Sequence, residues 1–242
     1  MEKEYIIRLL EELRKRLIII IVTVFVVAVV CFFFIEEIRQ VLMLPGEELE
    51  MKLIYLNPSE ALMANLRLSF IASGMLTLPI LLYQLIALVL AVTRRHRRSA
   101  YLLSLAMYVL FALGISFAYF VVFPFALKFF LSFSADDLVA QFSIARYISF
   151  ATGFLLSFGL VFQLPLVFWF LGSIGLVSTA FLRQNRKYAL LVIMIFSAIL
   201  TPPDVFSQIL MAIPLMILYE MGIILVYFSQ RKRARQNPDL TA

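Results

Sequence analysis

The chain has 242 residues, of which 63% are hydrophobic and 15% charged, whereas an ordinary soluble domain is about 45–50% apolar and about 25% charged. A soluble globule of this length has too little interior to cover so much apolar surface. We therefore expect most of the chain to lie in lipid, and we exclude a secreted soluble enzyme, a disordered tail and a disulfide scaffold.

The net charge is +6, and the basic residues stand in short clusters between apolar runs. That arrangement is typical of the cytoplasmic side of a membrane protein, so we expect no nucleic-acid partner. Cys31 and His96 are the single cysteine and the single histidine. Thiolate metal sites and Ser-His-Asp or Cys-His chemistry need partner sets that such a chain lacks, so we expect no metal, no cofactor and none of these catalytic chemistries.

Six apolar stretches predict six transmembrane helices, because about 20 apolar residues cross a hydrocarbon layer of roughly 30 Å. They lie at about 17–35, 68–93, 99–127, 147–172, 188–200 and 205–228. The fourth charge-free run continues to residue 182, long enough for two short spans. The fifth is only about 20 Å long as a helix, short of the membrane unless the bilayer thins around it.

The distribution of lysine and arginine favours six spans with both termini in the cytoplasm. With the N-terminus inside, 16 of the 21 basic residues fall on the inner side: five in 3–16, four in 94–98, three in 183–187 and four in 231–235. Splitting the fourth run into two spans would place the third cluster and the C-terminus outside. We keep one span there.

The fold class expected from this pattern is an all-α, polytopic membrane protein that forms a single domain over residues 1–242. Residues 1–16 are expected to form an amphipathic cytoplasmic helix and residues 229–242 a basic cytoplasmic tail. Four prolines inside or near the spans are expected to kink their helices and to make a curved wall. They are Pro79, Pro124, Pro165 and Pro214.

Polar features of the outer connections indicate local structure. Pro45-Gly46 is a turn signal in the long first loop, and the run from Asn57 to Glu60 is typical of a helix start. The second loop, 128–146, is expected to contain short helical structure.

Several polar residues lie inside or beside the apolar runs. Glu220 is the only acid well inside a span, so it is either functional or paired, or else a neutral or water-exposed group toward the cytoplasmic half of span six. Gln84 and Gln163 are suited to hydrogen bonds between helices or to simple packing. Gln208 lies one turn after Asp204 and shares its face, while Asp204 is also placed to cap the last span.

Five segments carry a likeness to one family. They are Glu12-Leu13-Arg14-Lys15-Arg16-Leu17, Leu81-Leu82-Tyr83-Gln84, 117–124, Tyr147-Ile148-Ser149-Phe150, and 201–214 with Thr201-Pro202-Pro203-Asp204, Ser207-Gln208 and Ala212-Ile213-Pro214. In these segments the chain resembles TatC, the core subunit of the twin-arginine translocase. The matches occur in the family's order and cover nearly the whole chain, and the family's topology agrees with the one inferred above.

The resemblance implies a receptor and not an enzyme. TatC-like proteins of the cell inner membrane bind the twin-arginine signal peptides of folded precursors at their cytoplasmic face. They assemble into an oligomeric complex with TatA- and TatB-like single-span partners, and the proton-motive force drives transport. Glu12 matches an acidic residue of the signal-peptide site, and we expect Arg14 and Arg16 beside it in that site. The alternative for Glu12 is a surface ion pair with Arg16.

We expect a second group of residues at partner-binding or intramembrane polar positions. They are Gln163, Pro202, Asp204, Gln208 and Glu220.

The sequence departs from the family at two positions of functional interest. Arg97 stands where the family usually has an acid that contacts the signal peptide, and a guanidinium accepts no hydrogen bond from another guanidinium. Gln163 replaces a family glutamate in the fourth span. Two alternatives follow: a membrane scaffold with an impaired signal-peptide site, and a secondary transporter that uses Glu220 and Gln163.

Overall fold

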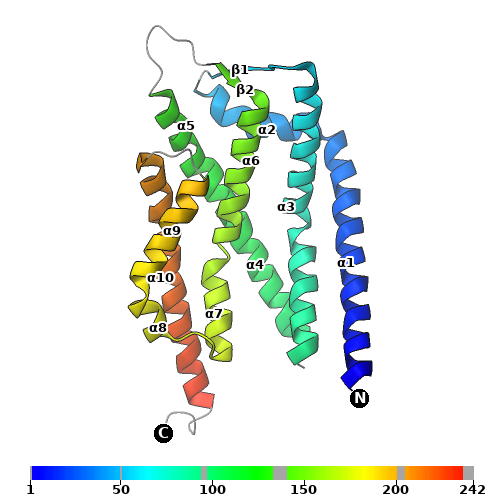
Figure 1. The fold of residues 1–242 in the computed structure, drawn as a ribbon, viewed down its shortest axis with the longest axis vertical. Coiled ribbons are helices and arrows are strands. Elements are labelled where there is room, and N and C mark those ends of the chain that lie inside the picture. The colour runs from blue at the N-terminus through cyan, green and yellow to red at the C-terminus, as the bar shows by residue number, and fades with distance from the viewer. Residues whose placement is uncertain (1, 50, 94–96, 133–140, 201–204, 237–242) are drawn as a thin grey trace. The chain divides into compact units, whose positions relative to one another are not determined.

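The computed structural model describes residues 2–49, 51–93, 97–132, 141–200 and 205–236, most of which are helical (Figure 1). Contacts divide the chain into two compact units. Unit 1 comprises Met1–Val109 and Ser134–Thr152, and unit 2 comprises Leu110–Phe133 and Gly153–Ala242. Two helices contribute to both units: α4 (Arg97–Phe117) and α6 (Ile144–Val161). The single membrane domain expected from the sequence stays a prediction.

Unit 1 is built on the antiparallel packing of α1 (Glu2–Phe33) against α3 (Pro58–Thr93), seen in Figure 1. α1 is one continuous helix, so the segment expected as a cytoplasmic helix runs directly into the first span. Its 32 residues extend to about 48 Å at 1.5 Å per residue, longer than the hydrocarbon layer. One end of α1 therefore projects beyond the hydrocarbon.

The first loop is more ordered than the sequence indicates. It holds α2 (Ile35–Glu47), which continues through Pro45. The turn expected at Pro45-Gly46 therefore follows the end of the helix, where the Met51 amide donates to the Gly46 carbonyl over 3.1 Å. β1 (Lys52–Ile54) follows and pairs in parallel with β2 (Gln141–Ser143), with Leu53 opposite Phe142. Each strand leads into a long helix, so the pair fixes the starts of α3 and α6 side by side.

Unit 2 contains two interruptions near prolines. A π-helical segment, η1 (Ala118–Val122), joins α4 to α5 (Phe123–Leu131). The second residue of α5 is Pro124, whose nitrogen carries no hydrogen to donate. The fourth predicted span breaks at residues 162–163, between α6 and α7 (Leu164–Ile174), and Pro165 occupies the first turn of α7. By contrast, α3 continues through Pro79.

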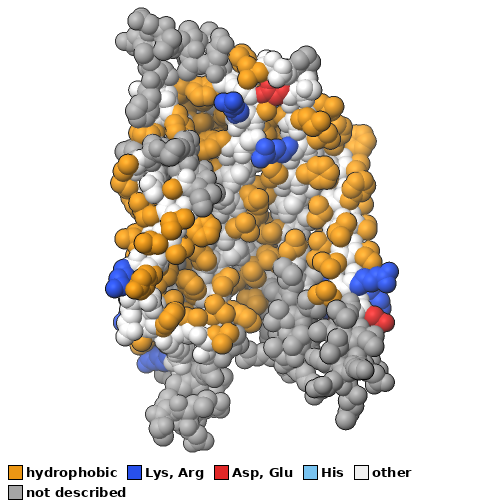
Figure 2. Space-filling model, viewed as in Figure 1, with side chains coloured by type: hydrophobic (Ala, Val, Ile, Leu, Met, Phe, Trp, Pro, Cys, Tyr) orange, Lys and Arg blue, Asp and Glu red, His pale blue; other side chains and the backbone are white. Residues whose placement is uncertain are grey.

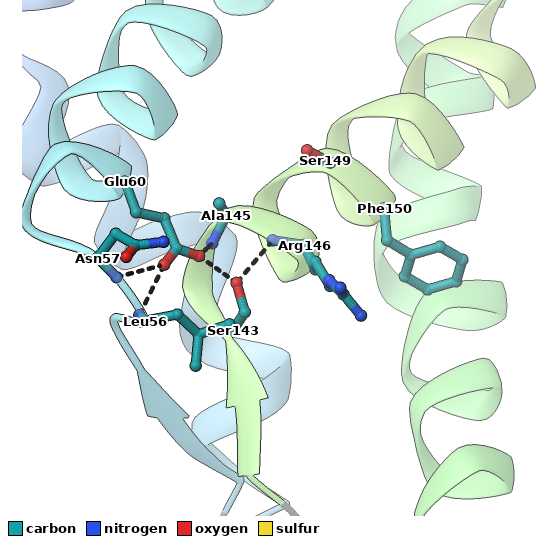
Figure 3. Close-up of a pocket in the computed structure, with 8 residues that line it drawn as sticks. All are labelled: Leu56, Asn57, Glu60, Ser143, Ala145, Arg146, Ser149 and Phe150. Carbon is teal, nitrogen blue, oxygen red and sulfur yellow. Dashed lines mark hydrogen bonds between the residues drawn. The ribbon is translucent and has the colours of Figure 1, made fainter.

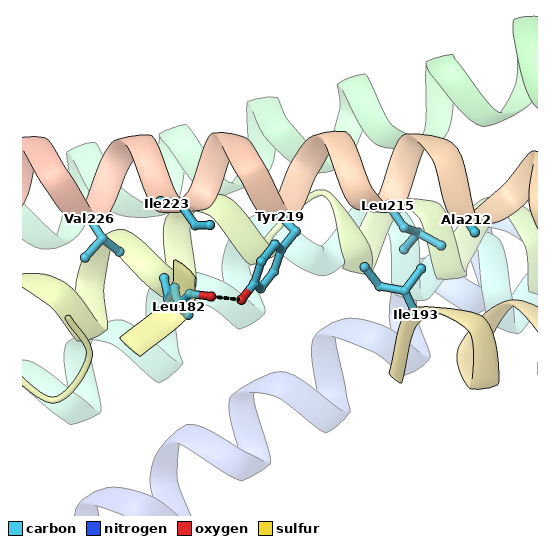
Figure 4. Packing of buried hydrophobic residues seen from close by; sticks show 7 residues of the cluster. All are labelled: Leu182, Ile193, Ala212, Leu215, Tyr219, Ile223 and Val226. Atoms are coloured by element: carbon cyan, nitrogen blue, oxygen red, sulfur yellow. Dashed lines mark hydrogen bonds between the residues drawn. The ribbon is translucent and has the colours of Figure 1, made fainter. Parts of the chain in front are cut away.

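The remaining helices of unit 2 are α8 (Thr179–Gln184), α9 (Arg186–Leu200) and α10 (Val205–Gln236), and α10 packs on α7, α8 and α9. The centre of this packing holds seven buried residues, shown in Figure 4: Leu182, Ile193, Ala212, Leu215, Tyr219, Ile223 and Val226. The Tyr219 hydroxyl donates to the Leu182 carbonyl over 2.8 Å. The buried polar group is thereby satisfied and links α10 to α8.

Five helical stretches of the described chain are long and apolar enough to cross a membrane. They are Glu11–Phe33, Ser59–Gln84, Leu102–Leu131, Ile144–Ser173 and Met211–Arg231. They overlap predicted spans one to four and six, and the fifth predicted span corresponds to α9, which has 15 residues. At about 22 Å it stays shorter than the hydrocarbon thickness.

Large apolar side chains cover the surface of the described helices, as in a protein whose solvent is lipid. Phe33 is 79% exposed and Phe120 is 73% exposed. Figure 2 shows hydrophobic side chains over most of the visible face, with charged ones toward its two ends. Exposed apolar surface on this scale is incompatible with a soluble monomer. The expectation of an all-α polytopic membrane protein is confirmed.

Candidate functional site

The polar segment of α1 before its apolar run forms a cluster with α3. Glu12 and Arg16 are one helical turn apart, and Arg16 Nη2 donates to Glu12 Oε1 over 2.7 Å. Arg16 Nη1 lies 3.2 Å from both the backbone oxygen and the side-chain Oε1 of Gln84. Gln84 therefore accepts hydrogen bonds from another helix, which is one of the two alternatives considered for it from the sequence. We call these three residues the Glu12 cluster.

Within the Glu12 cluster, the arginine is the shielded member and the carboxylate is the accessible one. The side chain of Arg16 is 19% exposed and that of Glu12 is 45% exposed. Arg16 thus holds the Glu12 carboxylate in place from the α3 side. An ionised carboxylate has two acceptor oxygens, and among the described contacts only Oε1 of Glu12 is engaged. A further guanidinium can therefore bind this group through a charge-assisted hydrogen bond.

Two other residues expected at this site are placed differently. Arg14 is exposed, and its position two residues after Glu12 puts it on another face of α1. Arg97 is the first residue of α4, but its side chain lies outside the described part of the chain. The opposition of Arg97 to a bound arginine stays a prediction.

Gln163, at the break between α6 and α7, is buried with 7% of its surface exposed. Its side-chain nitrogen donates to the Gly159 carbonyl over 3.2 Å, one turn earlier in the chain. The amide is therefore part of the local structure at the interrupted span, which is the packing alternative considered from the sequence.

Glu220 on α10 is paired. Its Oε2 accepts from Arg186 Nη2 at the start of α9 over 2.7 Å, and both side chains are partly exposed. The pairing lowers the cost of a carboxylate within the last span. A second polar contact joins the same helices, because Gln208 Nε2 donates to the Met194 carbonyl over 2.9 Å. Pro202 and Asp204 lie outside the described residues, so the shared face of Asp204 and Gln208 stays a prediction.

The sequence analysis missed two contacts that join segments far apart in the chain. Ser143 donates to the Glu60 carboxylate, and Arg67 Nη1 donates to Ser149 Oγ over 2.7 Å. A sequence signal exists for the arginine, because Arg67 is the last charge before the second apolar run. Within the described residues, no three His, Cys, Asp or Glu side chains are placed to hold a metal ion.

Long apolar helices with few charges, joined by polar contacts between α1 and α3 and between α9 and α10, define a polytopic helical membrane protein. The family model described as Sec-independent protein translocase protein (TatC) matches residues 8–214. The chain belongs to the TatC family, whose members are components of a protein translocase and not enzymes.

Individual relatives agree with this assignment. The chain is 40% identical to the Sec-independent protein translocase protein TatC of Carboxydothermus hydrogenoformans, over 92% of this chain and 93% of that one. It is 34% identical to TatCd of Bacillus subtilis, over 97% and 96% of the two chains. A crystal structure of a twin-arginine translocase receptor, TatC, matches with a TM-score of 0.81 and 35% identity, covering 91% of this chain and 99% of that one.

Proposed function

We propose that this protein is the receptor subunit of a twin-arginine translocase and binds the twin-arginine signal peptides of folded proteins at its cytoplasmic face. The observation that carries this proposal is the half-exposed Glu12 carboxylate in a chain of the TatC family; Arg16 pairs with this carboxylate and also bonds to Gln84. A carboxylate fixed in this way binds a guanidinium with less loss of side-chain entropy than a free one.

The proposed topology places both termini in the cytoplasm of a cell whose inner membrane holds the protein. The N-terminal end of α1 and the C-terminal end of α3 lie at the same end of unit 1 (Figure 1), which supports a Glu12 cluster that faces the basic, cytoplasmic side. The basic tail after residue 228 belongs to that side as well.

TatA- and TatB-like single-span proteins are the proposed partners, in an oligomeric complex driven by the proton-motive force. Support comes from α9, a short helix with exposed apolar side chains such as Leu191 and Phe196. A helix shorter than the hydrocarbon thickness draws the bilayer thinner around it. We infer that partner helices assemble beside α9 for that reason.

Titration of a fluorescent twin-arginine signal peptide against the full chain in lipid nanodiscs tests peptide binding. Glu12→Gln keeps the shape and removes the charge, so we expect affinity to fall by about tenfold or more, because hydrogen bonds to charged groups contribute about 1.5–3 kcal/mol. Glu11→Gln is the matched control, since Glu11 is exposed and adjacent. A twin-lysine peptide measures specificity. Equal affinity of wild type and Glu12→Gln would refute the role of Glu12.

Arg97 favours a second candidate, a membrane scaffold with an impaired signal-peptide site. Two like unit charges 4 Å apart repel by about 1 kcal/mol in water and about 4 kcal/mol at an effective dielectric constant of 20. A scaffold of this kind would bind neither the twin-arginine nor the twin-lysine peptide, and Glu12→Gln would then change nothing.

A further inference from the structure

A second polar site lies in unit 1 at the opposite end from the Glu12 cluster, where α3 and α6 begin. A cavity of about 560 Å³ opens there between the two helices (Figure 3). Asn57 and Glu60 line it from the start of α3, and Ser143, Arg146, Ser149 and Phe150 line it from β2 and α6. We call it the arginine pocket.

Glu60 builds the wall of the arginine pocket. Its Oε1 accepts from the Ser143 hydroxyl and, over 3.3 Å, from the Ala145 amide. Its Oε2 accepts from the Leu56 amide over 2.7 Å and from the Asn57 amide over 3.3 Å. Four donors therefore share the two carboxylate oxygens, and the charge of Glu60 is committed to joining the starts of α3 and α6.

Arg146 lines the pocket, and Arg67 contacts the lining residue Ser149; neither has a carboxylate partner among the described residues. The three ion pairs of the described chain involve Arg16, Arg39 and Arg186. The exposed Arg146 side chain points away from Glu60 in Figure 3. Arg67, also exposed, donates one Nη1 hydrogen to Ser149, which lies one helical turn after Arg146. Arg67 thus reaches the turn of α6 on which Arg146 lies, and the described contacts leave most donors of both guanidinium groups unused.

The depth of these arginines identifies the ligand chemistry. Arg67 is the last charged residue before the charge-free run 68–93, and Arg146 is the last before 147–182. The charge-free runs place both near one edge of the hydrocarbon layer, from which long basic side chains extend to the phosphates of lipid headgroups. Phe150 lies one helical turn after Arg146 on α6 and adds an apolar side chain to the lining of the pocket.

We propose that the arginine pocket binds the phosphate group of a phospholipid. Guanidinium groups bind phosphate oxygens through paired hydrogen bonds, and two of them match the single negative charge of a phosphodiester with one positive charge to spare. The Glu60 carboxylate accepts from the four donors named above and forms no described ion pair with either arginine. A bound lipid would hold the starts of α3 and α6 together and brace unit 1 at this membrane surface.

Native mass spectrometry of the full chain in detergent, titrated with phosphatidylglycerol, tests the proposal. We expect wild type to retain one lipid, and Arg67→Gln with Arg146→Gln to weaken retention by roughly fivefold for each arginine. Lys128→Gln is the matched control, because Lys128 is an exposed cation on α5, and it should leave retention unchanged. Arg146→Gln alone tests the site without loss of a described side-chain contact, should the double variant fold poorly.

Two further ligands distinguish a lipid phosphate from free phosphate. Diacylglycerol, which has the acyl chains without the phosphate, should not be retained. Inorganic phosphate at the same concentration should not displace the lipid. The proposal is overturned if the arginine variants retain phosphatidylglycerol as wild type does, if diacylglycerol is retained equally, or if inorganic phosphate or an acidic peptide competes as well as the lipid.

Discussion

Close approach of α4 and α6 depends on Gly114, and replacing this glycine with alanine should destabilise the protein. A Cβ at position 114 would lie 2.8 Å from the Phe158 carbonyl oxygen and 2.8 Å from Cγ of the Phe162 ring. Carbonyl oxygens of a helix cannot move without moving the helix. Small residues of this kind let membrane helices approach closely, and packing contributes much of their association.

The size of the effect follows from two opposing contributions. Alanine is about 1 kcal/mol better than glycine inside a helix, whereas overpacking costs typically 1–3 kcal/mol. Gly153→Ala is the matched control, because Gly153 lies on α6 and a Cβ there meets nothing within 4 Å. Both variants share the gain in helix propensity, so the difference between them isolates the clash at about 1–3 kcal/mol.

Unfolding by sodium dodecyl sulfate in mixed micelles, followed by circular dichroism, measures this difference. We expect Gly114→Ala to unfold at a lower detergent fraction than wild type, and Gly153→Ala to unfold at the same or a higher one. If the two variants unfold together, the close approach of α4 and α6 at Gly114 does not contribute to stability.

Three further predictions concern binding, stability and partner assembly. In a peptide titration, Arg97→Glu should strengthen binding of a twin-arginine peptide, and the control Arg98→Glu should strengthen it less. Equal affinities of wild type and Arg97→Glu would show that Arg97 does not repel the peptide. Tyr219→Phe leaves the buried Leu182 carbonyl without its donor, so we expect a loss of about 1 kcal/mol in the same unfolding assay, and no loss would mean that this bond is replaced. Lengthening α9 by one apolar turn should reduce crosslinking to TatA-like partners, and unchanged crosslinking would exclude local thinning as the cause of assembly.

The sequence predicts the apolar helices well, because charge-free length and positive clusters are properties of single segments. It places the fifth helix at 188–200, and the structure begins it at Arg186. For the fourth run we rejected the alternative of two spans on charge; the structure divides this run into α6, α7 and the start of α8, with a break at 162–163 before Pro165. A proline in the sequence indicates that a helix is interrupted, but it does not indicate how the helical segments before and after the interruption are arranged.

The contacts between distant segments could not be read from the sequence. β1 and β2 are three residues each, too short to show alternation, and the second lies in a loop expected to be helical. Glu60 looks like an acid at a helix start, and its bond to Ser143 spans 83 residues of chain. By contrast, the pair of Glu12 and Arg16 has helical spacing, and it was the alternative considered for Glu12. The contact of Gln84 with Arg16 was not predicted from the sequence.

Export of a folded fluorescent cargo tests the receptor role most directly. The chain is expressed in cells that lack their own TatC-like subunit and contain TatA- and TatB-like partners. We predict that cargo with a twin-arginine signal peptide crosses the inner membrane, that the twin-lysine version does not, and that Glu12→Gln reduces export while Glu11→Gln leaves it intact. Normal membrane insertion with no export by wild type or by Arg97→Glu would contradict the proposed receptor and leave the scaffold.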